Sequence, residues 1–87
     1  MTLYTQVSNQ PTSFRVQYCG LNSCRLSWTP PVEGYEWSAL LNYNILYWKQ
    51  STPSLVKKVT VPPSAREYLL SDLDSGTVYY ASVSSLV

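Results

Sequence analysis

The stretch that decides the fold is residues 73–83, Leu-Asp-Ser-Gly-Thr-Val-Tyr-Tyr-Ala-Ser-Val. It begins with a polar Asp-Ser-Gly corner, in which Gly76 supplies backbone freedom and the two preceding side chains can hydrogen-bond nearby backbone groups. After the corner, successive side chains point alternately to the two faces of a strand, with Tyr79, Ala81 and Val83 on one face and Tyr80 and Ser82 on the other. This pattern predicts a strand over residues 77–83, with Tyr79 and Val83 facing a core.

Working outward from this stretch, the rest of the chain also has the patterns of short strands. The eight tyrosines favour pleated, half-buried surfaces, which points to an all-β chain. Proline pairs at 30–31 and 62–63 end two of the apolar stretches, because proline cannot donate to a strand ladder. Strands are predicted at 14–18, 24–28, 43–48, 55–61 and 68–70.

Three segments, in this order, resemble the motifs of fibronectin type III domains. Residues 26–31 look like the Leu-x-Trp-x-Pro-Pro segment that opens such domains, and residues 43–47 read Tyr-x-Ile-x-Tyr. Residues 73–79 match Leu-x-x-Gly-Thr-x-Tyr, so the resemblance runs from about Pro11 to Val83. It implies an immunoglobulin-like two-sheet β-sandwich of fibronectin type III topology, with strands A–F and with strand G absent.

The resemblance also implies which side chains form the core. Trp28 would be its centre, and the hydroxyl of Tyr79 would return to the backbone upstream and lock one sheet to the other. The expected core residues are Trp28, Tyr43, Ile45, Tyr47, Leu70, Leu73, Tyr79 and Val83.

The two ends of the chain raise a question of domain organisation. Residues 1–10 are expected to be a linker or the end of a preceding domain, and residues 11–87 a domain truncated after strand F. Residues 84–87 are too few for a loop and a further strand, so strand F is expected to have an open edge. Either the domain boundary is misplaced, or residues 2–8 of one chain complete the strand F edge of another in a homodimer or array.

Composition excludes several classes of function. A net charge of +1 gives no basic field for nucleic acid, and the apolar runs are too short for membrane insertion. No signal peptide is recognisable at the start. The family resemblance implies an extracellular protein or the ectodomain of a membrane protein, of which this segment would be an excised piece.

The sequence offers no recognisable catalytic chemistry. The absence of histidine removes Ser-His and Cys-His nucleophile pairs and the commonest zinc ligand. The three glycines are scattered, so no phosphate-binding loop is present. Asp72 and Asp74 are either solvated turn residues or a weak cation site. We therefore expect no enzyme, no cofactor and no metal.

Cys19 and Cys24 flank a short turn between two predicted strands. They either form a disulfide, which would stabilise the domain by only ~2 kcal/mol across so short a loop, or remain reduced. In the second case Cys24 is a small buried hydrophobe and Cys19 a surface thiol.

Two groups of residues are candidates for binding a protein partner. Alternation places Leu46, Trp48 and Tyr80 on the outer face of one sheet, where they either form an exposed apolar patch or are covered by neighbours. Tyr35 and Trp37, in the loop before residue 43, are either tucked over the core or presented to a partner. The predicted function is a non-catalytic interaction or spacer module of a larger extracellular receptor or cell-adhesion protein, in contact with protein partners and neighbouring domains.

Overall fold

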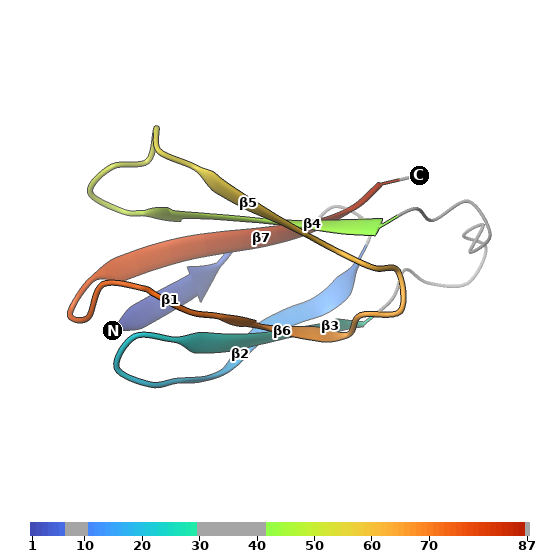
Figure 1. Ribbon diagram of the computed structural model, residues 1–87, viewed down its shortest axis with the longest axis horizontal. Helices are drawn as coiled ribbons and strands as arrows, with labels where there is room; N and C mark the ends of the chain where they lie inside the picture. Colours follow the sequence, from blue (N-terminus) through green and yellow to red (C-terminus); the bar gives the residue numbers. More distant parts are fainter. Residues whose placement is uncertain (7–10, 30–41, 87) are drawn as a thin grey trace.

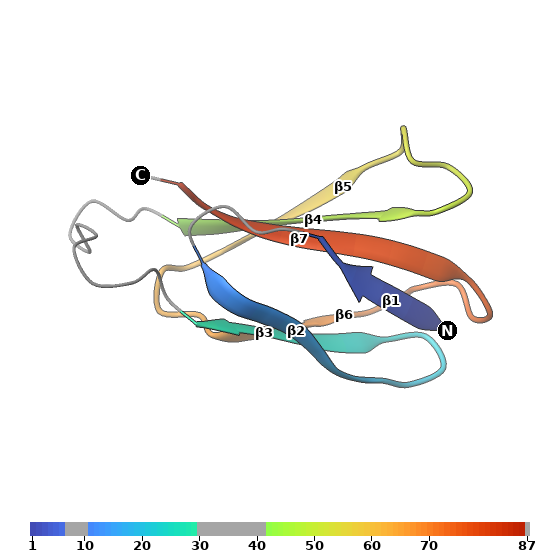
Figure 2. The ribbon, with the colours of Figure 1, turned by 180° about the vertical axis from the view of Figure 1, so that it is seen from behind.

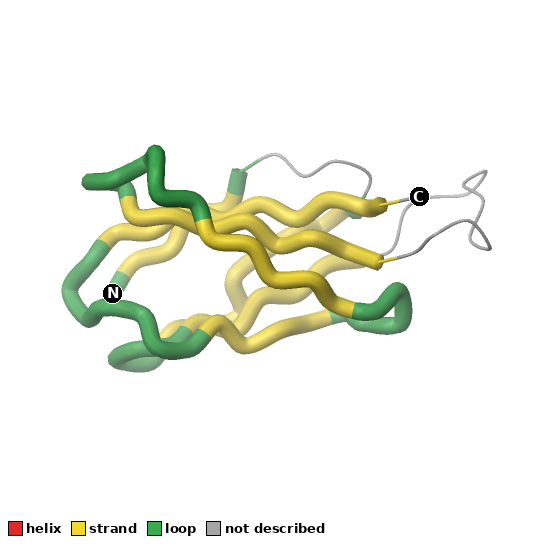
Figure 3. The backbone as a smooth tube through the Cα atoms, turned by 45° about the horizontal axis from the view of Figure 1, so that its top comes forward, coloured by secondary structure: helices red, strands yellow, loops and turns green. Residues whose placement is uncertain are grey.

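The computed structural model describes residues 1–6, 11–29 and 42–86, and they form two β-sheets that face each other (Figure 1). The described chain consists of strands and the loops between them (Figure 3). One sheet has the strand order β1-β7-β4-β5 and the other β2-β3-β6. The strands are β1 (Thr2–Thr5), β2 (Thr12–Cys19), β3 (Cys24–Thr29), β4 (Asn42–Lys49), β5 (Lys57–Val61), β6 (Glu67–Leu70) and β7 (Val78–Leu86).

The core forms where the alternating faces of the two sheets meet. Trp28 of β3 lies edge-on to Tyr43 of β4, with ring centroids 5.6 Å apart, so the pair bridges the sheets. Phe14 of β2 also packs edge-on against the indole, with ring centroids 6.5 Å apart. The structure buries each of the expected core residues except Tyr47, which is partly buried against them; the remaining buried hydrophobic residues are Leu3, Cys24, Leu26, Val61 and Ala81.

The corner between β6 and β7 ties both sheets together. The backbone N–H of Asp74 donates to the Tyr79 hydroxyl at 2.9 Å, as the family resemblance implies. Leu73 is buried, and its backbone N–H and carbonyl bond to the carbonyl and side-chain amide of Asn22 in the β2–β3 turn. Gly76 has a φ of 69°, the left-handed conformation that glycine adopts without cost. The corner is thus held by Tyr79 on one sheet and Asn22 on the other.

The edge of β7 is where the structure departs from the sequence-based expectation. β1 pairs in parallel with β7, from Thr2 opposite Val78 to Thr5 opposite Ala81 (Figure 2). Leu3 is buried in the core, and β1 also contacts β2. The expectations of a missing strand and of an open edge along 78–81 are therefore wrong: the described residues form seven strands, and the same chain covers that edge.

The reason for this difference lies in residues 1–10, which the sequence analysis placed outside the domain. The alternation around Leu3 is real, but alternation alone does not show which strand a segment pairs with. The last strand also continues further than expected, to Leu86.

The other strands lie close to their predicted positions, and β5 begins at Lys57 rather than at residue 55. Between β2 and β3, Cys19 and Cys24 lie opposite each other and are joined by a disulfide. Tyr35 and Trp37 lie outside the described residues.

Candidate protein-binding face

The outer face of the four-stranded sheet carries a row of three aromatic side chains, Tyr4, Tyr80 and Trp48, here called the aromatic row. The register of the sheet places them side by side, because Tyr80 of β7 lies opposite Tyr4 of β1 and also opposite Trp48 of β4. The Tyr4 and Tyr80 rings are 5.7 Å apart and tilted by 33°, and the Trp48 and Tyr80 rings are 6.1 Å apart and stacked. Three strands therefore contribute to one continuous surface.

The aromatic row is accessible to solvent. Tyr4 is 54% exposed, and Trp48 and Tyr80 are partly exposed. Leu46 lies two residues before Trp48 on the same face of β4 and is also partly exposed. The sequence left open whether Leu46, Trp48 and Tyr80 form an exposed patch or are covered by neighbours; in the structure all three lie on one face and are partly exposed.

Polar groups border the aromatic row on two sides. The side-chain amide of Gln50 donates to the Tyr80 hydroxyl at 3.3 Å, and Lys58 lies opposite Leu46 on β5. Farther along the sheet, the Thr60 hydroxyl donates to the Asn44 side-chain oxygen at 3.0 Å. An apolar centre with a polar border is the arrangement found in protein interfaces.

Tyr4 belongs to this surface, although sequence reasoning did not include it. The tyrosine was visible in the sequence, but residues 1–10 were assigned to a linker or to another domain. The parallel pairing of β1 with β7 brings its ring to Tyr80. Only the position of β1 in the sheet reveals this contact.

The outer face of the other sheet is chemically different. There the Arg25 guanidinium donates to the Tyr18 hydroxyl at 3.2 Å and pairs with Glu67 at 3.1 Å. The hydrogen bond that Arg25 donates to Tyr18 is the main cause that raises the pKa of Arg25. Tyr18, the aromatic side chain of this network, is therefore already bonded to a cation.

The two carboxylates of the β6–β7 corner have separate roles in the structure. Asp74 pairs with the Lys49 ammonium, whose hydrogen bond and charge hold the pKa of Asp74 below its usual range. Asp72 has a φ of 58° in the turn. Within the described ranges, no group of three or more histidine, cysteine or acidic residues is placed to hold a metal ion.

None of the described segments is a helix long and apolar enough to cross a membrane. The structure instead resembles known β-sandwiches. It superposes on the FN1–FN3 domains of chicken CNTN1 with a TM-score of 0.77 and 22% identity, covering 92% of this chain and 27% of that one.

Two further solved structures have the same fold. A protein from a computer-based redesign of a β-sandwich gives a TM-score of 0.72 at 19% identity, over 86% of this chain and 71% of that one. A structure described as a myokine gives a TM-score of 0.73 at 20% identity, over 91% of this chain and 80% of that one. At these identities the likeness shows the fold alone, and the chain spans about a quarter of the CNTN1 chain.

No curated protein matches the chain. The sequence model of the fibronectin type III domain, in contrast, matches residues 9–86. The match takes in Trp28, the residues of β4 and the Tyr79 corner, whose contacts the structure shows. The chain therefore belongs to the fibronectin type III domain family.

Proposed function

We propose that this domain is a non-catalytic protein-interaction module of a larger extracellular receptor or cell-adhesion protein, and that it binds its partner through the outer face of the four-stranded sheet. The observation that carries the proposal is the aromatic row, which joins Tyr4, Tyr80 and Trp48 across three strands. Domains of this family typically act as interaction or spacer modules in extracellular proteins.

The physical argument rests on what the aromatic row offers a partner. Tyrosine and tryptophan bury large areas while they lose little side-chain entropy, and they are enriched among the residues that dominate binding energy. Trp48 and Tyr80 already support each other by stacking, so the surface is preorganised. The disulfide fits an extracellular setting, where such bonds persist.

The non-catalytic part of the proposal rests on the side chains available. The chain contains no histidine, and fibronectin type III domains are generally non-catalytic. Asp74 is paired with Lys49, and Glu67 with Arg25.

The test is a binding screen with matched surface variants. The purified domain, tetramerised to raise its avidity, is applied to an array of purified ectodomains. For a genuine partner, Trp48→Ser and Tyr80→Ser should each weaken binding roughly tenfold or more, as expected for central interface residues. Tyr18→Ser, an exposed tyrosine on the other sheet, should change binding less than about twofold.

The variants must remain folded for this comparison to count. Loss of the stacking should cost about 0.5–1.5 kcal/mol beyond the apolar area that each side chain buries, and that area is limited because both are partly exposed. The proposal is wrong if bound partners tolerate both substitutions, or if Tyr18→Ser alone removes binding. It is also wrong if no ectodomain binds.

A second candidate function is self-assembly by exchange of β1. The observation that favours it is the parallel pairing of β1 with β7, since the same backbone contacts and the Leu3 side chain could be supplied by another copy. Light scattering across about a hundredfold dilution tests it. Exchange predicts a dimer that dissociates on dilution and that is absent when residues 1–6 are deleted; a monomer throughout, or a dimer that survives the deletion, refutes it.

A further inference from the structure

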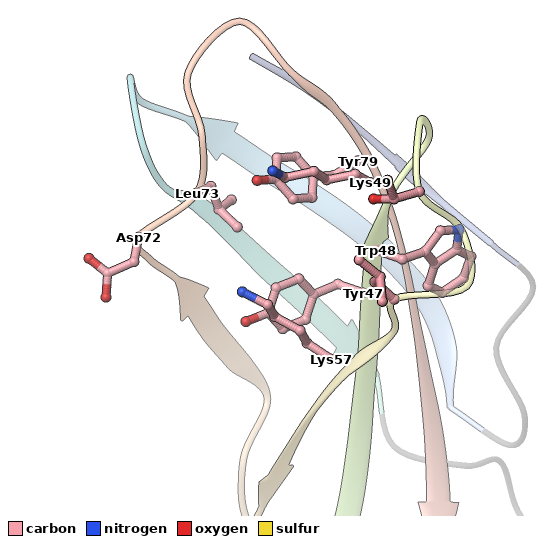
Figure 4. A pocket seen from close by; sticks show the side chains of 9 residues that line it. Tyr47, Trp48, Lys49, Lys57, Asp72, Leu73 and Tyr79 are labelled. Carbon is pink, nitrogen blue, oxygen red and sulfur yellow. The ribbon is translucent and has the colours of Figure 1, made fainter.

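A pocket of about 250 Å³ opens at the end of the sandwich near the β6–β7 corner (Figure 4). In Figure 4 the side chains of Tyr47, Lys49, Lys57 and Tyr79 extend from β4, β5 and β7 toward the corner, whereas Trp48 extends to the opposite side of β4. Trp48 is also a lining residue of the pocket, although its ring extends to the outer side of the sheet, whereas Tyr4 and Tyr80 of the aromatic row do not line it. Substitutions at Tyr80 and Lys57, each of which belongs to one surface alone, therefore test the two surfaces separately.

The size of the pocket limits what it can hold. Sites for drug-sized molecules and cofactors occupy roughly 300–1,000 Å³, so this pocket is too small for most of them. One or two amino-acid side chains would fill it. Leu73 is buried at its inner end, and Leu55, which is 68% exposed, lies at its rim. An apolar group that covered Leu55 would gain contact area that is now open to water.

The polar groups of the pocket differ in whether they already have a bonding partner. The Lys49 ammonium is paired with Asp74. Within the described part of the chain, the Lys57 ammonium has no hydrogen bond or ion pair, although it lines the same pocket. Burial is the main cause that raises the pKa of Tyr47, so its hydroxyl remains a hydrogen-bond donor throughout the neutral range. Lys57 and Tyr47 thus offer two donors without a hydrogen-bond partner among the described residues, and the Lys57 charge acts at longer range on Asp74, whose pKa it helps to lower.

Asp72 is the one lining residue that opposes an anion. Figure 4 shows its carboxylate turned outward, away from Tyr47 and Lys57. The Asp72 charge limits the occupant to one negative group, because a second negative group would lie near the Asp72 carboxylate and be repelled by it. A single carboxylate next to an apolar group is the occupant that fits both the donors and the walls.

We propose that this pocket binds the carboxylate of a glutamate side chain from a partner protein, held by Lys57 and Tyr47, with an adjacent apolar side chain packed against Leu55 and Leu73. The contact with Lys57 is a charge-assisted hydrogen bond, which is stronger than one between neutral groups. It adds a second, charge-specific contact to the domain and does not depend on the aromatic row.

The matched pair Lys57 and Lys58 allows a sharp test. Neighbouring residues of a strand point to opposite faces, so Lys57 lines the pocket and Lys58 lies on the outer face beside Leu46. The probe is the capped peptide acetyl-Ala-Glu-Leu-Ala-amide, with the Gln counterpart as its control. Both are titrated into the ¹⁵N-labelled full chain, and the amide shifts of Tyr47, Lys57 and Leu73 are followed by NMR.

The Glu peptide should give saturable shifts, and the Gln peptide should bind roughly tenfold more weakly. Lys57→Gln should weaken Glu-peptide binding by a similar factor, and Lys58→Gln by less than about twofold. Asp72→Asn should strengthen it, because a repelling charge is removed. Tyr80→Ser should leave it unchanged, which separates this site from the aromatic row.

Three results would overturn the proposal. They are equal binding of the Glu and Gln peptides, equal losses in the two lysine variants, and the lack of any saturable shift in the pocket residues. Lys57 is exposed, so its replacement should not unfold the domain, and the amide spectrum of each variant verifies this.

Discussion

The hydroxyl of Tyr79 is the smallest group whose removal tests how the two sheets are locked. Tyr79 is only 4% exposed, and its hydroxyl accepts the backbone N–H of Asp74 at 2.9 Å. Tyr79→Phe keeps the ring and deletes this acceptor, which leaves a partly buried backbone donor without its partner. Such a loss costs about 1–3 kcal/mol, and we take ~2 kcal/mol as the expected decrease in the free energy of unfolding.

A decrease of this size is easily measured. For a domain of this length, 1 kcal/mol corresponds to roughly 4–8 °C in Tm, so Tyr79→Phe should melt about 8–16 °C lower. Urea denaturation should show a lower midpoint with an unchanged slope, since the surface exposed on unfolding is the same.

The neighbouring tyrosine is a matched control. Tyr80 also has one hydrogen bond to its hydroxyl, but that bond is 3.3 Å long and exposed to solvent. Tyr80→Phe should therefore change stability by less than about 0.5 kcal/mol, because water replaces the lost partner. Equal effects of the two substitutions, or an effect of Tyr79→Phe below about 0.5 kcal/mol, would refute the reasoning that the corner locks the sandwich.

Three other predictions concern the disulfide, an ion pair and β1. Replacing Cys19 and Cys24 together by alanine should lower the free energy of unfolding by about 2 kcal/mol in urea denaturation, because the bond closes only a short loop. Asp74→Asn should remove a small stabilisation that wild type shows at neutral pH and loses below about pH 4, measured as the difference in Tm across pH. The sign follows because Lys49 lowers the folded-state pKa of Asp74, so the contribution is present above the unfolded pKa and is lost as the pH falls through the folded one. Leu3→Ala should cost about 2 kcal/mol in urea denaturation, since Leu3 is the buried side chain of β1.

Each of these has an outcome that would contradict it. If reductant shifts the midpoint of the alanine double variant as much as that of wild type, the disulfide is not the cause. If the Tm difference between Asp74→Asn and wild type stays constant down to pH 2, protonation of Asp74 does not remove a stabilising ion pair. If Leu3→Ala is no more destabilised than Thr5→Ala, an exposed position on the same strand, β1 does not belong to the core.

The sequence predicted those elements that are determined by residues close to them along the chain. Trp28 and Tyr79 lie in motifs that specify a strand, its end and a corner, and the structure shows them in the corresponding contacts. The burial of Tyr43 and Ile45 follows from strict alternation in one strand. These inferences need no knowledge of distant parts of the chain.

Contacts between distant segments could not be obtained in this way. The alternation around Leu3 suits a strand of this domain, of a neighbour or of a second copy equally well, and only the sheet pairing decides among them. The Lys49–Asp74 ion pair joins a strand end to a remote corner, so the sequence could not show that Asp74 has a cationic partner. Tyr4 was omitted from the candidate surface for the same reason.

The most direct test of the proposed function is oxidative footprinting of side chains in the complex with a partner found on the ectodomain array. Tyr4, Trp48 and Tyr80 should be modified in the free domain and protected in the complex, because the aromatic row forms the interface. Tyr18, on the opposite face, should be modified equally in both states. Protection of Tyr18 with unchanged modification of the aromatic row would place the interface on the other sheet and contradict the account.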